Sequence, residues 1–466
     1  MTEKTILRGR VLSFSGEPQH AEDSGAFTYI EDGAVVLADG LIQATCAFNA
    51  LIDTDMAGAR IVDHRPHLIL PGFIDAHLHF PQMNAVGSWG AQLIEWLNTY
   101  TFPQEARFAE KAHAERMADW FINQLISQGT TTVATYCSVH KNSAEALFAA
   151  AKKKNYRLIA GKVLMDRNAP IQVLDTPQTG YDDTKALIAE WHGKGRIDYA
   201  ITPRFAITST PEQMETVATL IAEHPDCYVQ THLDENHYEI ELTLGLYPKA
   251  KDYLDIYETY GMLGRKSLFG HCIHLNDRER AAMANSGSVA VFCPTSNLFL
   301  GSGLFDEALM KSSGIRTAIA TDIGGGTSYS MLRTLDEGYK VLQVQNQNLD
   351  PLRAFYWVTL GNAHALSKQH QIGTLQPGTE ADIVVLCSRA TSTMAMRMET
   401  AASLREELFV LQTFGDDRSV VETYVSGKAA KEVTGESDGP DCRGMDPAIH
   451  KLGTIKDCIV DKKSVF

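Results

Sequence analysis

Several features that would assign a function at once are missing from this sequence. No Gly-x-Gly-x-x-Gly segment follows an apolar run, so a dinucleotide-binding fold has no support. The eight cysteines are dispersed and include no Cys-x-x-Cys pair, which predicts reduced thiols in the cytoplasm. The net charge of −15 argues against binding nucleic acid or an anionic membrane surface. No apolar run is long enough for a membrane span or a signal peptide.

The composition is that of a globular protein. The 466 residues include 44% hydrophobic and 21% charged residues. This length accommodates a large domain with a smaller one, or two to four ordinary domains.

Both ends of the chain have the pattern of β structure. In residues 1–70, Asp39-Gly40 separates two apolar runs, which is a strong hairpin signal. Residues 381–386 and 420–425 have the same strand-like character, and neither end shows long helical periodicity. We therefore predict one small β-sandwich domain built from residues 1–70 and 372–432. The polar tail, 433–466, is expected to be a surface extension.

The middle of the chain, residues 71–371, alternates β-rich runs with helix-length segments. A helical pattern over 112–127, for example, ends at Gly129. Eight such units predict an α/β fold, a (β/α)₈ TIM-like barrel. An open, doubly wound sheet is the competing topology, which strand counting does not exclude. The expected strands are 71–79, 131–136, 158–164, 199–204, 228–232, 267–271, 288–292 and 317–322.

Metal-ligating residue types recur at the ends of these strands. His77 and His79 point to one face of the first strand, because alternate side chains of a strand share a face. In a barrel the carboxyl ends of all strands converge, which adds His232, His271 and Asp322. Four imidazoles and a carboxylate suit zinc or iron. For a single histidine, a structural role would be the better interpretation.

Two further polar residues lie close to these ends. Glu235 follows His232 by three residues, where it can act as a proton shuttle, although a solvated loop acid is the competing interpretation. His274 follows His271 by three residues and is interpreted as a supporting or structural residue.

At this point the chain resembles the amidohydrolase superfamily and, within it, the guanine deaminases. The superfamily resemblance rests on residues 71–79, 231–233, 270–272, 321–322 and 373–382. The finer resemblance rests on residues 79–82, 95–98, 101–103, 165–170, 202–205, 293–297, 301–303 and 415–419. It covers nearly the whole chain except the tail.

This resemblance implies hydrolysis of guanine to xanthine and ammonia by a metal-activated water. It implies one Zn²⁺ per chain, with Fe²⁺ as the alternative, in a cytoplasmic homodimer that acts on a small purine in guanine catabolism. Glu235 would shuttle protons, while Asp322 and His271 position the water and relay its proton. The implied metal ligands are His77, His79, His232, His271 and Asp322, and the implied substrate-binding residues are Gln82, Arg204, Phe205, His232 and Glu235.

The implied purine contacts fit the chemistry of guanine. Its O6 and N7 are adjacent acceptors, an edge that Arg204 or Gln82 can contact, and Phe205 can stack on the ring. The competing interpretation is that Gln82 and Arg204 are surface residues and Phe205 fills the core.

Three alternatives remain beside this hypothesis. A two-metal hydrolase bridged by a carboxylated lysine is disfavoured, because the fourth strand has no lysine and Lys162 lies in the third. The second alternative is a different substrate, another aminated heterocycle such as 8-oxoguanine or a triazine. The pocket motifs favour guanine, but related enzymes that act on such compounds can share them. A non-catalytic scaffold is the third, and the intact set of ligand-type residues speaks against it.

Overall fold

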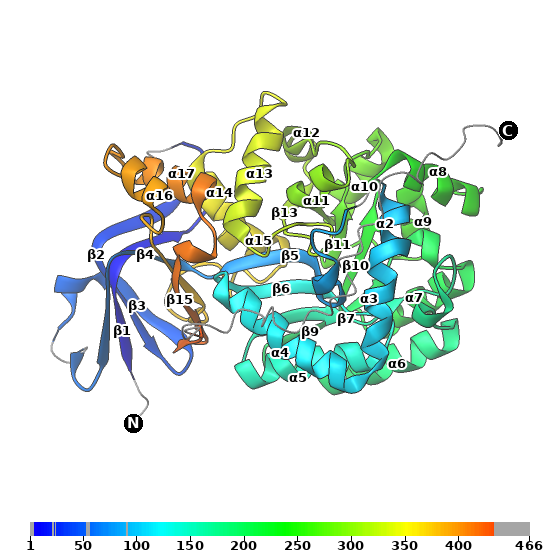
Figure 1. Ribbon diagram of the computed structural model, residues 1–466, viewed down its shortest axis with the longest axis horizontal. Helices are drawn as coiled ribbons and strands as arrows, with labels where there is room; N and C mark the ends of the chain where they lie inside the picture. The colour runs from blue at the N-terminus through cyan, green and yellow to red at the C-terminus, as the bar shows by residue number, and fades with distance from the viewer. Residues whose placement is uncertain (1–3, 21–22, 24, 53–55, 90–91, 433–466) are drawn as a thin grey trace, which may run out of the picture. The chain divides into compact units, whose positions relative to one another are not determined.

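A parallel β-sheet carries the residues that the sequence placed at strand ends. The computed structural model describes residues 4–432 except 21–22, 24, 53–55 and 90–91. The strands follow the order β13-β12-β11-β10-β9-β7-β6-β5, and β8 pairs with β9 (Figure 1). They are β5 (Phe73–His79), β6 (Thr130–Tyr136), β7 (Arg157–Gly161), β8 (Val163–Leu164), β9 (Ile197–Pro203), β10 (Tyr228–Leu233), β11 (Ser267–His271), β12 (Val289–Phe292) and β13 (Arg316–Ile319).

The first and last of these strands meet at their carboxyl ends. The backbone N–H of Asp322, just after β13, donates to the carbonyl of His77 in β5 at 2.9 Å. The N–H of Thr321 donates to the Asp75 carboxylate at 3.1 Å. The strands therefore curl into a nearly closed barrel, which confirms the predicted (β/α)₈ fold over an open sheet.

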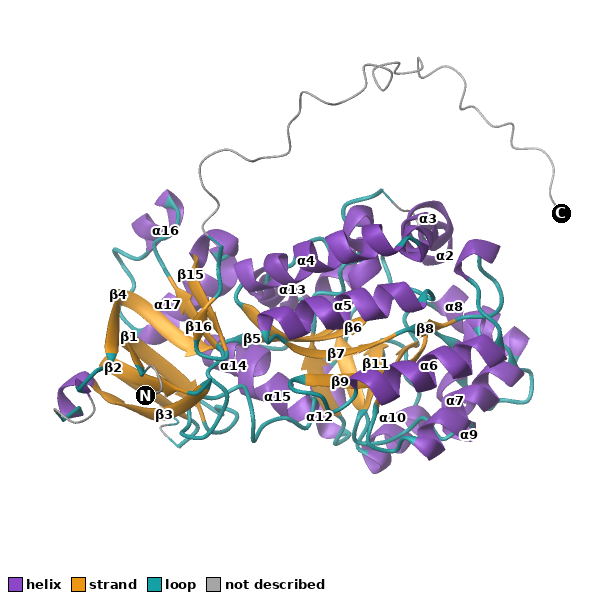
Figure 2. Cartoon of the chain, turned by 90° about the horizontal axis from the view of Figure 1, so that it is seen from below, coloured by secondary structure: helices purple, strands orange, loops and turns teal. Residues whose placement is uncertain are grey.

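Helices cover the outside of the barrel, as the view from below shows (Figure 2). The helix predicted over 112–127 is α4 (Lys111–Ser127), and Gly129 follows it with a φ of +81°. Three helices begin with a capping box, which satisfies the free backbone N–H groups of the first turn. They are α6 (Pro177–Trp191), α8 (His237–Leu246) and α10 (Asp277–Ser286).

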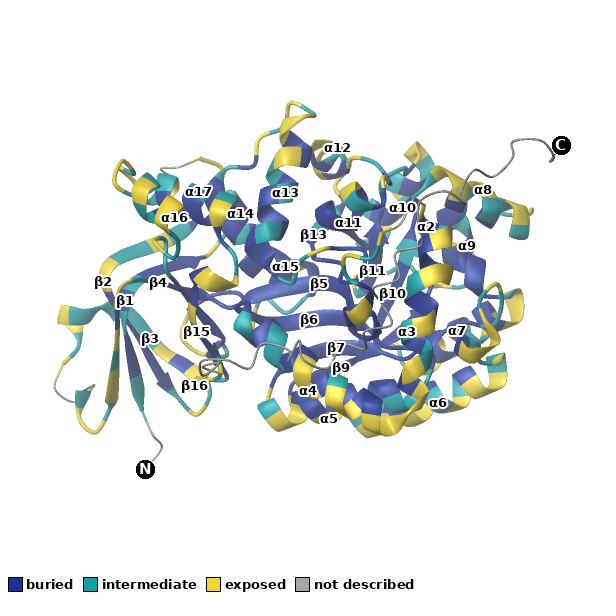
Figure 3. Cartoon of the chain, in the orientation of Figure 1, coloured by how far each residue is buried: buried dark blue, intermediate teal, exposed yellow. Residues whose placement is uncertain are grey.

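The remaining barrel helices complete the βα alternation. The strands are buried while the helices expose their outer faces (Figure 3). These helices are α5 (Lys141–Lys154), α7 (Pro211–Glu223), α9 (Tyr253–Thr259), α11 (Pro294–Phe299), α12 (Glu307–Ser312), α13 (Met331–Gln343), α14 (Pro351–Tyr356) and α15 (Asn362–Ala365). No helix of the described residues is sufficiently long and apolar to cross a bilayer.

The two ends of the chain share one mixed sheet, in the order β16-β15-β14-β4-β1-β2-β3. The predicted hairpin is present, and Asp39 and Gly40 both have positive φ. Pro71 of β4 pairs with Ile383 of β14, so the ends join where the chain enters the barrel. The expected sandwich is thus one continuous sheet of β1 (Thr5–Phe14), β2 (Phe27–Ala38), β3 (Leu41–Ala47), β4 (Arg60–Pro71), β14 (Ile383–Leu386), β15 (Val420–Val425) and β16 (Lys428–Ala429).

Two details differ from the sequence-based expectation. The C-terminal end is not free of helix, because α16 (Ser392–Arg397) and α17 (Leu404–Phe414) lie between β14 and β15. In α17, Leu404, Leu408 and Leu411 follow the i, i+4, i+7 spacing of a helix, and Leu408 and Leu411 are buried, so a short helical pattern was present in the sequence. The eighth strand stops at Ile319 rather than 322, since Asp322 adopts a φ of 51°. The predicted tail, 433–466, lies outside the described residues.

A separate helical segment covers the end of the barrel between β5 and β6. It consists of η2 (Phe80–Ala85), α2 (Leu93–Trp96), η3 (Leu97–Thr101) and α3 (Phe102–Ala106). Trp96, Leu97 and Phe102 of this segment pack with Phe205 and Tyr136 in one apolar cluster. This segment therefore forms a wall beside the strand ends.

Candidate active site

A pocket of about 390 Å³ opens at the carboxyl ends of the barrel strands. Among the predicted site residues it is lined by His79, Gln82, Arg204, Phe205, His232, Glu235, His271 and Asp322. The ninth, His77, lies beside them, with Nε2 3.4 Å from Oδ1 of Asp322. The structure thus brings together residues from β5, β9, β10, β11 and the segment after β13.

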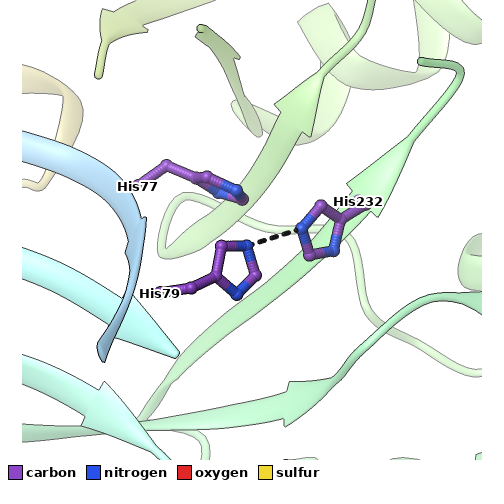
Figure 4. A group of neighbouring side chains, drawn as sticks. All are labelled: His77, His79 and His232. Carbon is purple, nitrogen blue, oxygen red and sulfur yellow. Dashed lines mark hydrogen bonds between the residues drawn. The ribbon is translucent and has the colours of Figure 1, made fainter. Parts of the chain in front are cut away.

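Three histidines form the centre of the site (Figure 4). Nε2 of His79 lies 3.1 Å from Nε2 of His232. Nδ1 of His232 lies 2.7 Å from the carbonyl oxygen of Arg204, which accepts from an Nδ1–H and so leaves Nε2 with a lone pair. Nε2 of His77 is buried and has no hydrogen-bond partner among the described residues. The ring nitrogens therefore face a common centre.

Asp322 completes this centre from the segment after β13, the strand whose carboxyl end meets that of β5. Its Oδ1 lies 3.4 Å from Nε2 of His77 and 3.5 Å from Nε2 of His79. Burial would raise the pKa of Asp322, but the neighbouring His77 and then His271 outweigh burial and hold it below its usual value. Asp322 is therefore a carboxylate at neutral pH. Burial lowers the pKa of both His79 and His232, and the neighbouring histidines and Arg204 lower it further. Both rings are therefore neutral.

Two groups of ligand-type atoms are close enough to share an ion. Within each group the atoms lie within 4.8 Å of one another. The groups are His77, His79 and His232, and His77, His271 and Asp322. Because His77 belongs to both, the five residues form one continuous set of nitrogen and oxygen ligands, of the kind that binds zinc or iron.

His271 lies at the edge of this set. Its Nε2 is 3.3 Å from Oε2 of Glu235 and 4.0 Å from Oδ2 of Asp322, while its Nδ1 is 2.9 Å from the Asn297 amide. The residue has a φ of 72°, a conformation that costs energy for a side chain other than glycine. Gly270 precedes it because a Cβ there would lie 2.6 Å from the His77 ring. His271 thus connects the histidine centre to Glu235.

Glu235 is buried on the loop after β10. Its Oε1 accepts a hydrogen bond of 2.7 Å from the Ser302 hydroxyl. Its backbone N–H donates to the carboxylate of Glu239 in α8 at 3.0 Å. Burial, followed by the charges of Glu239 and Asp322, raises the pKa of Glu235 well above its usual value. A raised pKa favours the protonated form of Glu235, which is the form that a proton donor needs.

Arg204, Phe205 and Gln82 line the pocket beside the histidines. Arg204 and Phe205 follow β9, and Gln82 lies in η2, three residues after His79. Arg204 is 3% exposed and Gln82 is 2% exposed, so neither is the surface residue of the competing interpretation. The Phe205 ring centroid lies 6.2 Å from that of His232 at 66°. Together they supply buried polar donors and an aromatic face to the pocket.

Three residues with direct roles in this geometry were not assigned a role from the sequence: Glu105, Ser302 and Asn297. Each lies in or near a family motif, but its partner is distant in sequence, as with Glu105 and Arg204, 99 positions apart. Pairings of that kind leave no spacing signal. His274 has the expected supporting position, since its Nε2 contacts the carbonyl of Ser302 at 2.9 Å.

Comparison with known proteins gives the same family as the sequence motifs. A sequence model of the amidohydrolase family matches residues 68–430. Guanine deaminase of Escherichia coli (strain K12) is 45% identical over 431 residues, 91% of this chain and 97% of that protein. The structure of E. coli guanine deaminase superposes with a TM-score of 0.88 at 44% identity, covering 91% of this chain and 99% of that one.

A third comparison adds a structure with a ligand. Guanine deaminase from C. acetobutylicum, with guanine bound in its active site, superposes with a TM-score of 0.82 at 29% identity. The match covers 92% of this chain and all of that one (100%). On the family model, the sequence identity and the shared barrel, this chain belongs to the amidohydrolase family and, within it, to the guanine deaminases.

Proposed function

We propose that this protein is a guanine deaminase, which hydrolyses guanine to xanthine and ammonia with a single metal ion. The observation that carries the proposal is one pocket that holds three kinds of group. These are a histidine and aspartate centre, a buried glutamate with a raised pKa and two buried hydrogen-bond donors beside an aromatic ring. The relative from Escherichia coli, 45% identical over 91% of this chain, is a guanine deaminase.

The residues present fit a metal ion. Nε2 of His77 is a buried polar atom that makes no hydrogen bond among the described residues, although Oδ1 of Asp322 lies 3.4 Å away, and a metal ion between the two atoms would satisfy both. His77, His79, His232 and Asp322 would hold the ion, and His271 completes the proposed set of five from the edge. We propose zinc, one per chain, with iron(II) as the alternative. The bound metal would supply Lewis-acid activation of the attacking water.

Arg204, Gln82 and Phe205 would orient the purine. Arg204 presents only hydrogen-bond donors, which suit the O6 and N7 acceptors of guanine. The Phe205 ring would lie against the purine face. With that edge held, C2 and its amino group face the histidines and Glu235.

The proton steps fall to Glu235, Asp322 and His271. Asp322, a carboxylate, would take a proton from the attacking water as it adds to C2. Glu235 in its protonated form would donate to the ring nitrogen, and His271 lies 3.3 Å from its Oε2 to hold it in place. Asp322 would then pass the water's proton to the amino group, which leaves the tetrahedral carbon as ammonia. The remaining hydroxyl proton on C2 would pass to Glu235 as the carbonyl of xanthine forms, so that both carboxyl groups return to their starting states. Water and guanine are thus converted to xanthine and ammonia.

The test is an ammonia-release assay with guanine, 8-oxoguanine, adenine, cytosine and a triazine. Fastest turnover of guanine supports the proposal. Faster turnover of 8-oxoguanine or a triazine would show that this compound, and not guanine, is the substrate. A chain that purifies without stoichiometric zinc or iron and releases no ammonia would support a non-catalytic scaffold.

The family resemblance also supports finer proposals. We propose that the protein acts as a cytoplasmic homodimer in guanine catabolism. We also propose that residues 71–371 form the hydrolase domain and that residues 1–70 with 372–432 form the second domain. Light scattering on the purified protein tests the dimer.

A further inference from the structure

Glu105 is a buried carboxylate behind two residues that line the pocket, and the mechanism above does not use it. It lies in α3, part of the helical segment between β5 and β6, and is 1% exposed. A buried charge needs a partner to be tolerated. The partners of Glu105 are the two polar residues proposed to hold the purine.

Arg204 and Gln82 both donate to this one carboxylate. The Nη1 of Arg204 lies 2.8 Å from Oε1 and 3.0 Å from Oε2 of Glu105. Nε2 of Gln82 donates to Oε1 at 2.9 Å. Phe102, one turn earlier in α3, places its ring 5.2 Å from the Arg204 guanidinium carbon. One short helix therefore holds the guanidinium by its charge and by its flat face.

These contacts decide which atoms remain for a ligand. Because Nη1 of Arg204 is engaged, Nε and Nη2 are the donors that make no hydrogen bond to Glu105. The Gln82 amide is oriented at both ends, since Nε2 donates to Glu105 and Oε1 accepts from the N–H of Gly324 at 3.3 Å. Without Glu105, the guanidinium would lose its anchor and the amide would lose the contact that sets which end is the donor.

We propose that Glu105 is a positioning residue that fixes Arg204 and Gln82 in place, so that the site selects purines with an oxygen at position 6. Guanine offers the acceptors O6 and N7, which match fixed donors. In 2,6-diaminopurine the 6-amino group is itself a donor and would oppose Arg204. A pocket with oriented donors rejects such an analogue because its buried groups are left unpaired. The inference rests on the proposed function.

The experiment measures kcat and KM for guanine and 2,6-diaminopurine, which both carry the reacting 2-amino group, in the metal-loaded full chain. Glu105→Gln should lower kcat/KM for guanine by about 10- to 100-fold, mainly through KM, because a hydrogen bond to a charged group is lost. The preference for guanine over 2,6-diaminopurine should fall by about tenfold. Unchanged values would overturn the proposal.

A double mutant separates positioning from a general structural role. If Glu105 acts through Arg204, adding Glu105→Gln to Arg204→Ala should cost less than about threefold more. Equal losses in both backgrounds would overturn the proposal. Glu307→Gln is the matched control, because Glu307 is a buried acid paired with Arg353 outside the pocket, and its kcat/KM should stay at the wild-type value.

Two further measurements keep the test decisive. If Glu105→Gln does not fold, Glu105→Asp, shorter by one methylene, should raise KM for guanine about 3- to 10-fold with normal metal content; an unchanged KM overturns the proposal. Equilibrium binding of xanthine, which keeps O6 and N7, should weaken in either variant and requires no turnover. A wild-type chain that binds xanthine but releases no ammonia from guanine would refute the proposed function alone.

Discussion

The hydroxyl of Ser302 lies 2.7 Å from Oε1 of Glu235 and donates to it. The two residues come from different βα units, 67 positions apart. With Oε1 occupied, Oε2 is the oxygen that faces His271, at 3.3 Å. The carboxyl group that is proposed to move protons is therefore held in one orientation before any substrate enters.

Replacing Ser302 with alanine should reduce kcat about 3- to 10-fold with little change in KM, because one hydrogen bond that orients Glu235 is lost. Steady-state kinetics with guanine measures this. Ser312→Ala, which removes an exposed hydroxyl on α12, is the control. A rise in KM at constant kcat would instead place Ser302 in contact with the substrate.

Replacing Glu235 with glutamine should abolish most turnover, a loss of at least about 100-fold in kcat, because glutamine cannot donate and regain a proton. Metal content, measured by elemental analysis, should stay at the wild-type level, since Glu235 is outside the proposed ligand set. Near-normal turnover would refute its role as the proton shuttle.

Replacing Arg204 with alanine should lower kcat/KM for guanine by about 100-fold or more, because donors to the purine edge are lost and Glu105 remains buried without its partner. Arg418→Ala, at an exposed ion pair far along the chain, serves as the control. An unchanged kcat/KM would exclude Arg204 from purine binding.

The stability of the protein should depend on pH through Glu239. Burial raises the pKa of Glu239 to about 7 in the folded protein. A carboxyl with a raised folded pKa favours folding at low pH, and this contribution is lost as pH rises from the unfolded value to about 7. Glu239→Gln removes the titration, so its free energy of unfolding relative to wild type should rise by up to roughly 3 kcal/mol over that window.

Thermal unfolding of the metal-saturated proteins between pH 4.5 and 8 measures that difference, and effects of pH that both proteins share cancel. Glu241→Gln, at an exposed position on the same helix, is the control. A difference between Glu239→Gln and wild type that does not change with pH would contradict the prediction.

Deleting the chain from about residue 435 should leave kcat/KM for guanine within about twofold of wild type. All the residues of the pocket lie between His77 and Gly325, well before the deletion. Kinetics and sedimentation of the truncated protein test this, and an insoluble or inactive product would refute it.

The sequence alone determined the alternation of strands and helices and the residues proposed for the histidine centre, for a local physical reason. Apolar runs alternate with helix-length segments, and strand periodicity places His77 and His79 on one face. The rule that barrel strand ends converge then gathers His232, His271 and Asp322 without knowledge of any contact. The hairpin at Asp39-Gly40 and the end of α4 at Gly129 are equally local, since each depends on a positive φ.

Tertiary structure alone decided the contacts that orient those groups. Glu105 with Arg204, Ser302 with Glu235 and Asn297 with His271 are pairs whose members lie tens of residues apart. No spacing rule connects them, because each pair forms only when helices and loops from different βα units are packed over the same strand ends. The burial that raises the pKa of Glu235 has the same origin, since the surrounding protein excludes water from a carboxyl group that spacing alone could not distinguish from a solvated loop acid.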